Sequence, residues 1–182
     1  MRLDIVPSFV TANEMAELNR WTEQGVENKW LDMGRSVCGA TDLRLNTRMY
    51  GHRFVYPKIA HEIFQRIRDH LGFVDTEIIK RHGRDGIVVS YTKVGGDVFK
   101  HKDNSKHGFS ALRCNIITQA ADCGGKLFVD GKQVDVKAGD LHCYLTSEYE
   151  HYVTEVEGNS PRIIWMFGFS IEKEMWEKDE LS

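Results

Sequence analysis

The tripeptide His101-Lys102-Asp103 is the clearest candidate for chemistry in this sequence. On a β-strand, residues i and i+2 project from the same face, so one imidazole and one carboxylate point in the same direction. These are two of the three ligands in the two-histidine, one-carboxylate arrangement that holds Fe(II) and leaves coordination positions open. An isolated pattern of this kind also fits a surface pair on a strand, so further residues are needed to indicate a metal site.

Two later residues could complete such a site. His151 heads the β-rich segment Tyr152–Val156 and is the candidate third ligand. Eleven residues after His151, Arg162 begins the apolar segment Ile163–Phe167. An arginine in this position requires an anion, because a buried charge without a partner is costly, and its guanidinium suits a carboxylate held by two hydrogen bonds. The residues alone leave open whether that carboxylate belongs to the protein or to a ligand.

The residues before position 76 predict two helices. Thr11 and Glu14 match a capping box, and apolar residues at helical spacing follow for about ten residues. Pro57 opens a second helix with one apolar stripe, and Gly72 ends it. We expect both helices to serve as packing scaffold.

After residue 75, short β-rich segments alternate with glycine, asparagine and aspartate. Asp130-Gly131 is a strong hairpin signal. Seven or eight short strands after two helices predict a mainly β (α+β) fold, a β-sandwich or jelly roll with the N-terminal helices packed outside. The expected strands are 87–94, 98–103, 112–119, 126–136, 140–146, 152–156 and 162–171.

A series of short motifs occurs in a fixed order: Val89-Ser90-Tyr91, His101-Lys102-Asp103-Asn104, Leu112-Arg113-Cys114, Cys123–Leu127, Lys137–Asp140, His151 and Arg162. Over about residues 86–169 this order resembles the Fe(II)/2-oxoglutarate-dependent oxygenases, specifically their prolyl 4-hydroxylase-like branch. The resemblance implies a double-stranded β-helix, which is a jelly roll and agrees with the strand pattern.

Carried over to this sequence, the resemblance implies that His101, Asp103 and His151 bind Fe(II). Arg162 would bind the distal carboxylate of the cosubstrate 2-oxoglutarate, and Tyr91 would line the cosubstrate pocket. The implied reaction uses O2, releases succinate and CO2 and hydroxylates a C–H bond, with ascorbate as a further cofactor. Related halogenases lack the carboxylate ligand, so Asp103 favours hydroxylation.

This sequence departs from the family in one place near the cosubstrate. Family members often carry a second tyrosine on the strand after Leu112, which shares the distal carboxylate with the arginine. Asn115 and Thr118 are the candidates to replace it here.

The other six of the eight histidines have no assigned role in the metal site. We interpret four of them as surface or core residues of the helical half, and His107 as part of a loop at the mouth of the site. His142, near Gly139-Asp140, is interpreted as incidental, although it lies on an expected strand. The four in the helical half are His52, His61, His70 and His82.

Composition excludes several classes of protein. The 182 residues are 41% hydrophobic and carry 24 Lys and Arg against 27 Asp and Glu, so a net charge of −3 gives no general attraction to nucleic acid or to an anionic membrane. We expect one domain over 1–182, with helical support at 1–75, a jelly-roll core at 76–171 and a solvated tail at 172–182. The four cysteines are spread without C-x-x-C pairs, which predicts reduced core thiols in a cytoplasmic protein without membrane spans.

The sequence therefore favours an oxygenase acting on a prolyl or other amino-acid residue in a peptide. A free amino acid, a small metabolite or a nucleobase is the alternative substrate. A hypothesis of another class is a non-catalytic jelly-roll or cupin-like binding protein. The oligomeric state is not predicted by any of these patterns.

Overall fold

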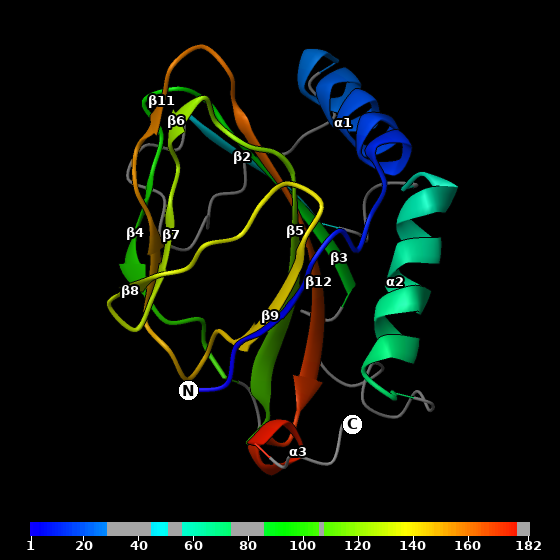
Figure 1. Cartoon of the computed structure of the whole chain (residues 1–182), viewed down its shortest axis with the longest axis vertical. Coiled ribbons are helices and arrows are strands. Elements are labelled where there is room, and N and C mark those ends of the chain that lie inside the picture. The colour runs from blue at the N-terminus through cyan, green and yellow to red at the C-terminus, as the bar shows by residue number, and fades with distance from the viewer. Residues whose placement is uncertain (29–44, 51–55, 74–85, 106–107, 178–182) are drawn as a thin grey trace.

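The computed structural model describes residues 1–28, 45–50, 56–73, 86–105 and 108–177, with 46–50 described by backbone alone. Its strands form a six-stranded sheet in the order β1-β9-β5-β12-β3-β2 and a four-stranded sheet in the order β4-β10-β7-β8, with a small β11-β6 pair. Figure 1 shows that these two larger sheets face each other and that α1 and α2 lie outside the six-stranded sheet. The predicted jelly roll with external helices is confirmed.

The elements run along the chain as β1 (Asp4–Val6), α1 (Ala12–Glu27), β2 (Asn46–Tyr50), α2 (Lys58–His70), β3 (Gly86–Thr92), β4 (Val98–His101), β5 (Ser110–Gln119), β6 (Cys123–Gly124), β7 (Leu127–Val129), β8 (Lys132–Gln133), β9 (Leu141–Leu145), β10 (His151–Val153), β11 (Val156–Glu157), β12 (Arg162–Ile171) and α3 (Lys173–Glu177). Every pairing between these strands is antiparallel. Among the described helices, none has the length and hydropathy needed to span a bilayer.

The first helix begins where the sequence predicts and runs further. Thr11 is the N-cap of α1, and the reciprocal hydrogen bonds of the capping box with Glu14 are both present. The helix has 16 residues instead of about ten, because Thr22 and Gly25 continue the buried face beyond Trp21 as far as Val26. Small residues of this kind do not register as part of a hydrophobic stripe.

One hydrophobic core lies between the helices and the outer face of the six-stranded sheet. The ring of Phe64 on α2 stacks against Phe167 and Phe169 of β12, with centroids 5.8 and 5.2 Å apart. Trp21 of α1 packs against Trp165 at 5.5 Å. These contacts make the six-stranded sheet a rigid support for the residues on its other face.

The inner face of the same sheet looks toward the four-stranded sheet. Tyr144 of β9 packs there against Leu127, Val129 and Val153 of the opposite sheet. Side chains alternate between the two faces of a strand, and residues paired across strands share a face. By this register the inner residues of β5, β9 and β12 include Arg113, Asn115, His142, Tyr144 and Arg162.

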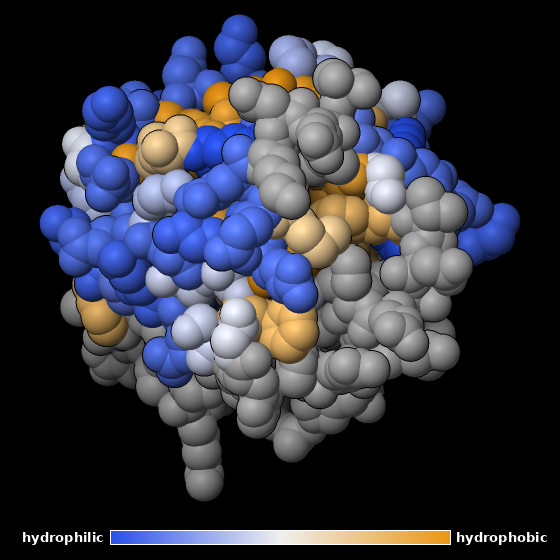
Figure 2. Space-filling view, turned by 90° about the horizontal axis from the view of Figure 1, so that it is seen from below, coloured by the Kyte–Doolittle hydropathy of each residue, from blue (hydrophilic) through white to orange (hydrophobic). Residues whose placement is uncertain are grey.

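The described part of the C-terminal tail is not wholly solvated, contrary to the prediction. Trp176 in α3 has no exposed surface, and the guanidinium of Arg2 lies 4.6 Å from the centroid of its ring. The end of the molecule that carries α3 is otherwise mostly hydrophilic where the structure describes it, with apolar side chains in small separate areas (Figure 2). The tail thus ties the last strand to the N-terminus.

Candidate metal centre and cosubstrate site

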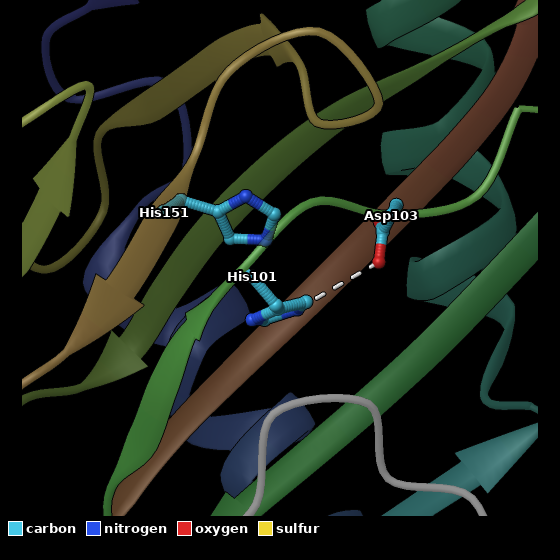
Figure 3. A group of neighbouring side chains, drawn as sticks. All are labelled: His101, Asp103 and His151. Atoms are coloured by element: carbon cyan, nitrogen blue, oxygen red, sulfur yellow. Dashed lines mark ion pairs between the residues drawn. The ribbon is translucent and has the colours of Figure 1, made fainter.

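His101, Asp103 and His151 lie close together and point toward one another (Figure 3). His101 ends β4 and His151 begins β10, and the two residues are paired in register across these strands. Their ring centroids lie 4.3 Å apart. One ligand atom from each of the three residues lies within 4.8 Å of the others, so a single ion can contact all three. The predicted cluster is therefore assembled by the fold.

The two histidines are held in the tautomer that metal binding requires. Nδ1 of His101 lies 2.8 Å from the carbonyl oxygen of Phe99, and Nδ1 of His151 lies 3.1 Å from that of Tyr149. A carbonyl oxygen only accepts, so each Nδ1 carries the proton and donates it. Each Nε2 then keeps a lone pair for the ion, and the backbone fixes the orientation of both rings.

Asp103 reaches the site from a loop, two residues beyond the end of β4. Its backbone N–H donates to the carbonyl oxygen of Thr146 at 2.9 Å, and the Thr146 hydroxyl donates to Oδ2 at 2.8 Å. Arg113 Nε lies 3.6 Å from the same oxygen. Oδ1 therefore turns toward His101, 3.8 Å from its Nε2, which is the separation marked in Figure 3. These contacts, and not strand alternation, place the carboxylate.

The donor set fits Fe(II). Two neutral imidazole nitrogens and one carboxylate oxygen converge from one side, which leaves the other coordination positions for ligands that are not protein side chains. The side chains of His101 and Asp103 are 8% and 16% exposed, so the site is shielded from solvent and still accessible.

Arg162 is buried on the inner face of the six-stranded sheet. The residue is 4% exposed, and neither Nε nor Nη2 has a hydrogen-bond partner among the described residues. Burial lowers the pKa of this guanidinium to about 10, so it stays charged at neutral pH. Its stem packs against Gly125, where an added Cβ would lie 3.2 Å from Arg162 Cδ. No carboxylate of the described residues pairs with Arg162. The guanidinium can therefore bind the carboxylate of a ligand.

Tyr144 connects the metal centre with Arg162. Its ring meets the ring of His151 edge-on at 5.6 Å. Burial raises the pKa of the Tyr144 phenol, the charge of Asp103 adds to this rise, and the charges of Arg162 and Arg113 oppose it. No local pattern in the sequence distinguishes Tyr144, because only the strand register shows that it faces inward.

The predicted position of Tyr91 is not the one observed. In the β3–β12 pairing Tyr91 lies opposite Ile163, and Arg162 lies opposite the next residue, Thr92. Tyr91 therefore projects from the outer face and packs with the core under the helices. Burial raises the pKa of Tyr91, and the charge of Glu23 on α1 adds to it, which agrees with this side of the sheet. The register thus contradicts a contact of Tyr91 with a ligand of Arg162.

The remaining histidines and cysteines fall into three groups. His61 and His70 are exposed on α2, as expected, whereas His142 is fully buried on the inner face. Cys114 and Cys143 are free thiols in the core, and Cys123 is free but exposed, so the core prediction holds for two of them. The predictions for His52, His82, His107 and Cys38 fall outside the described residues.

The comparisons with known proteins give similarity in structure and not in sequence. No protein-family model matches the sequence, and no curated protein matches it. The structure is similar to the viral collagen prolyl hydroxylase of Paramecium Bursaria Chlorella virus-1, solved as its 2OG complex, with a TM-score of 0.66, 14% identity and coverage of 94% of this chain and 97% of that one.

Two further solved structures share the fold. A Trichoplax adhaerens prolyl hydroxylase, in complex with a hypoxia inducible factor peptide fragment, has a TM-score of 0.69, 13% identity and coverage of 96% of this chain and 86% of its own. HygX from Streptomyces hygroscopicus, with nickel, 2-oxoglutarate and hygromycin B bound, has a TM-score of 0.61, 11% identity and coverage of 94% and 83%.

These neighbours define the class of fold. It is the jelly-roll fold of prolyl hydroxylases and other 2-oxoglutarate oxygenases, as the resemblance in the sequence implies. At these identities the similarity establishes the architecture alone. The chemistry must be argued from the site.

Proposed function

We propose that this protein is an Fe(II)- and 2-oxoglutarate-dependent dioxygenase that hydroxylates a C–H bond. Two features of the same barrel carry the proposal. His101, Asp103 and His151 form a cluster that could hold a metal ion. Arg162 is buried, and its Nε and Nη2 have no protein partner in the described chain. A metal ion satisfies the first. A carboxylate ligand satisfies the second, and 2-oxoglutarate is a ligand that can meet both at once.

Each residue then has a defined task. His101, Asp103 and His151 would hold the iron, and Arg162 would bind the distal carboxylate of 2-oxoglutarate and so orient its keto acid end toward the metal. When bound, iron supplies the oxidation chemistry: 2-oxoglutarate, O2 and a substrate C–H bond yield succinate, CO2 and the hydroxylated substrate. Thr146 and Arg113 keep the carboxylate of Asp103 in place. Tyr144, buried on the inner face, packs its ring against that of His151.

We propose a prolyl or other amino-acid residue of a peptide as the substrate. The solved neighbours that are prolyl hydroxylases support this choice, one of them holding a peptide fragment. Phe99, which is 52% exposed, meets the ring of the ligand His101 at 5.9 Å and offers an apolar contact beside the metal. The binding of hygromycin B by HygX favours a small molecule as the second candidate. Ascorbate dependence and a cytoplasmic location remain predictions.

The test is succinate release under air with Fe(II) and 2-oxoglutarate, measured across panels of peptides, free amino acids and small metabolites. We expect succinate formation that is stimulated by a peptide and matched by a mass increase of one oxygen atom in that peptide. Stimulation by a small molecule alone would replace the peptide assignment. Absence of succinate with every panel, in protein that binds Fe(II), would favour the non-catalytic binding protein.

A further inference from the structure

His142 is a buried histidine for which the proposed chemistry has so far given no role. It has no exposed surface, and neither Nδ1 nor Nε2 has a hydrogen-bond partner among the residues that the structure describes. A buried polar group without a partner is costly, so a ring with two such atoms calls for an explanation. Hydrophobic packing alone would be served better by an apolar side chain.

The place of His142 in the sheet connects it with both ends of the proposed cosubstrate site. It lies on β9 two residues before Tyr144 and on the same inner face, which corresponds to about 7 Å along the strand. Tyr144 contacts the metal ligand His151. Arg162 lies on the same inner face of the sheet, two strands away in the order β9-β5-β12, and its charge acts on both Tyr144 and His142. His142 therefore lies on the Arg162 side of the metal centre.

The protonation state of His142 suits donation to an anion. Burial, and to a smaller extent the charge of Arg162, lower the pKa of this imidazole to about 3, against the opposing effect of Asp140. The ring is thus neutral at physiological pH and offers one N–H donor and one lone pair. A bound carboxylate would provide the acceptor that the described part of the protein does not provide.

Two other residues on β5 are candidates for this role. Asn115 lies directly opposite His142, and its buried atom without a partner in the described chain is Oδ1, an acceptor whose need a carboxylate would not meet. Thr118 has a buried hydroxyl without a partner in the described chain. It lies in the irregular register between Ile163 and Ile164, close along the strand to Arg162, so the test below includes a Thr118 variant.

We propose that His142 donates its ring N–H to the distal carboxylate of 2-oxoglutarate, beside the guanidinium of Arg162, and thereby selects a dicarboxylate. This inference rests on the proposed function. His142 is a specificity-determining residue in this account, and not a catalytic one, because it does not touch the reacting atoms.

The test compares two keto acids of the same length. 2-Oxoglutarate and 2-oxopentanoate both have five carbons, and only the first has a distal carboxylate. Binding of each to the anaerobic Fe(II) protein is measured by spectroscopic titration for the wild type, H142F, H142Q and the control T118V. We expect H142F to lose about 10- to 100-fold in affinity for 2-oxoglutarate, with 2-oxopentanoate bound as in the wild type. H142Q, which keeps a donor, should recover part of the loss, and T118V should behave as the wild type.

Equal affinity of H142F and the wild type for 2-oxoglutarate would overturn the inference, and so would an equal loss for both acids. A loss confined to T118V would assign the role to the other candidate. If the wild type binds neither acid, the proposed function itself fails, which is a distinct result.

A second measurement does not depend on the stability of H142F. In wild-type protein loaded with Zn(II), which is diamagnetic, ¹⁵N NMR of labelled histidine reports the ring nitrogens of His142, assigned with H142Q. We expect 2-oxoglutarate to shift these signals and 2-oxopentanoate to leave them in place. Identical spectra with the two acids would contradict the proposed contact.

Discussion

The hydroxyl of Thr146 donates a hydrogen bond of 2.8 Å to Oδ2 of Asp103. This bond joins the end of β9 to the loop after β4, and a backbone hydrogen bond of 2.9 Å between the same two residues reinforces it. It occupies one carboxylate oxygen and leaves the other for a metal ion. The orientation of the only acidic residue in the cluster is therefore set before any ion binds.

We expect Thr146→Val to weaken metal binding by about 10- to 100-fold, because contacts that orient a ligand influence affinity on this scale. Competition with a chelator measures the dissociation constant. Thr146→Ser keeps the hydroxyl and should bind as the wild type. The carbonyl of Ala111, which also accepts from the Thr146 hydroxyl, still accepts from the Thr146 backbone N–H, so stability should change little. Unchanged metal affinity in the valine variant would show that the hydroxyl does not orient the ligand.

Asp103→Ala should reduce metal affinity by more than 100-fold and abolish succinate formation coupled to substrate, because the cluster loses its only carboxylate. The matched control is Asp135→Ala, which removes an exposed aspartate. Metal content after dialysis and substrate hydroxylation are measured together. Full activity of the Asp103 variant would remove Asp103 from the ligand set.

Arg162→Leu should have opposite effects on stability and on cosubstrate binding. The metal-free and cosubstrate-free protein should gain about 1–3 kcal/mol in free energy of unfolding, because a buried charge with unpaired nitrogens is removed. Affinity for 2-oxoglutarate should fall by about 100-fold or more while metal affinity is kept. Chemical denaturation and ligand titration measure the two effects. A destabilised variant that binds 2-oxoglutarate normally would contradict both expectations.

The free energy of unfolding should decrease as the pH is lowered, and part of this decrease should come from His142. Its pKa is about 3 in the folded protein and near 6.5 when unfolded, so the unfolded state takes up a proton first as the pH falls. The stability that comes from keeping His142 neutral is therefore fully present above pH 6.5 and is lost as the pH falls from 6.5 to 3. By pH 5 the loss is about 2 kcal/mol in free energy of unfolding. Denaturation of the wild type and of His142→Leu at pH 7 and 5 should show a shallower dependence in the variant. Equal slopes would indicate that the ring is not held neutral.

Trp176→Ala should destabilise the protein by about 3–5 kcal/mol, because a fully buried ring is removed and its contact with Arg2 is lost. The neighbouring Met175 is 39% exposed, and Met175→Ala should cost less than 1 kcal/mol. Thermal unfolding of both variants measures the difference. Similar small effects would show that the C-terminal helix is not part of the core.

Local signals in the sequence were enough to predict the scaffold. The capping box of Thr11 and Glu14, the helix after Pro57 and the strand-rich second half each depend on neighbouring residues, and all three occur in the structure. The three members of the metal cluster were also predicted, although the reason given for Asp103 was incomplete. Its side chain is placed by Thr146 and Arg113, which are distant in the sequence.

The register between paired strands could not be predicted from a single sequence. The sequence therefore did not show which sheet face Tyr91, His142 and Tyr144 occupy. A shift of one residue moves a side chain to the opposite face of a sheet. The resemblance implies that Tyr91 lines the cosubstrate pocket, whereas its pairing with Ile163 places it on the face under the helices. His142 and Tyr144 were passed over for the same reason, since only their pairing with Asn115 and Arg113 shows that they face inward.

The central claim is that one barrel binds Fe(II) through His101, Asp103 and His151 and binds 2-oxoglutarate through Arg162. The most direct test is the visible absorption spectrum of the anaerobic Fe(II) protein as 2-oxoglutarate is added. We expect a weak charge-transfer band that saturates with one equivalent of cosubstrate and requires much higher concentrations in Arg162→Leu. A spectrum that does not change in the wild type, with Fe(II) shown to be bound, would contradict it.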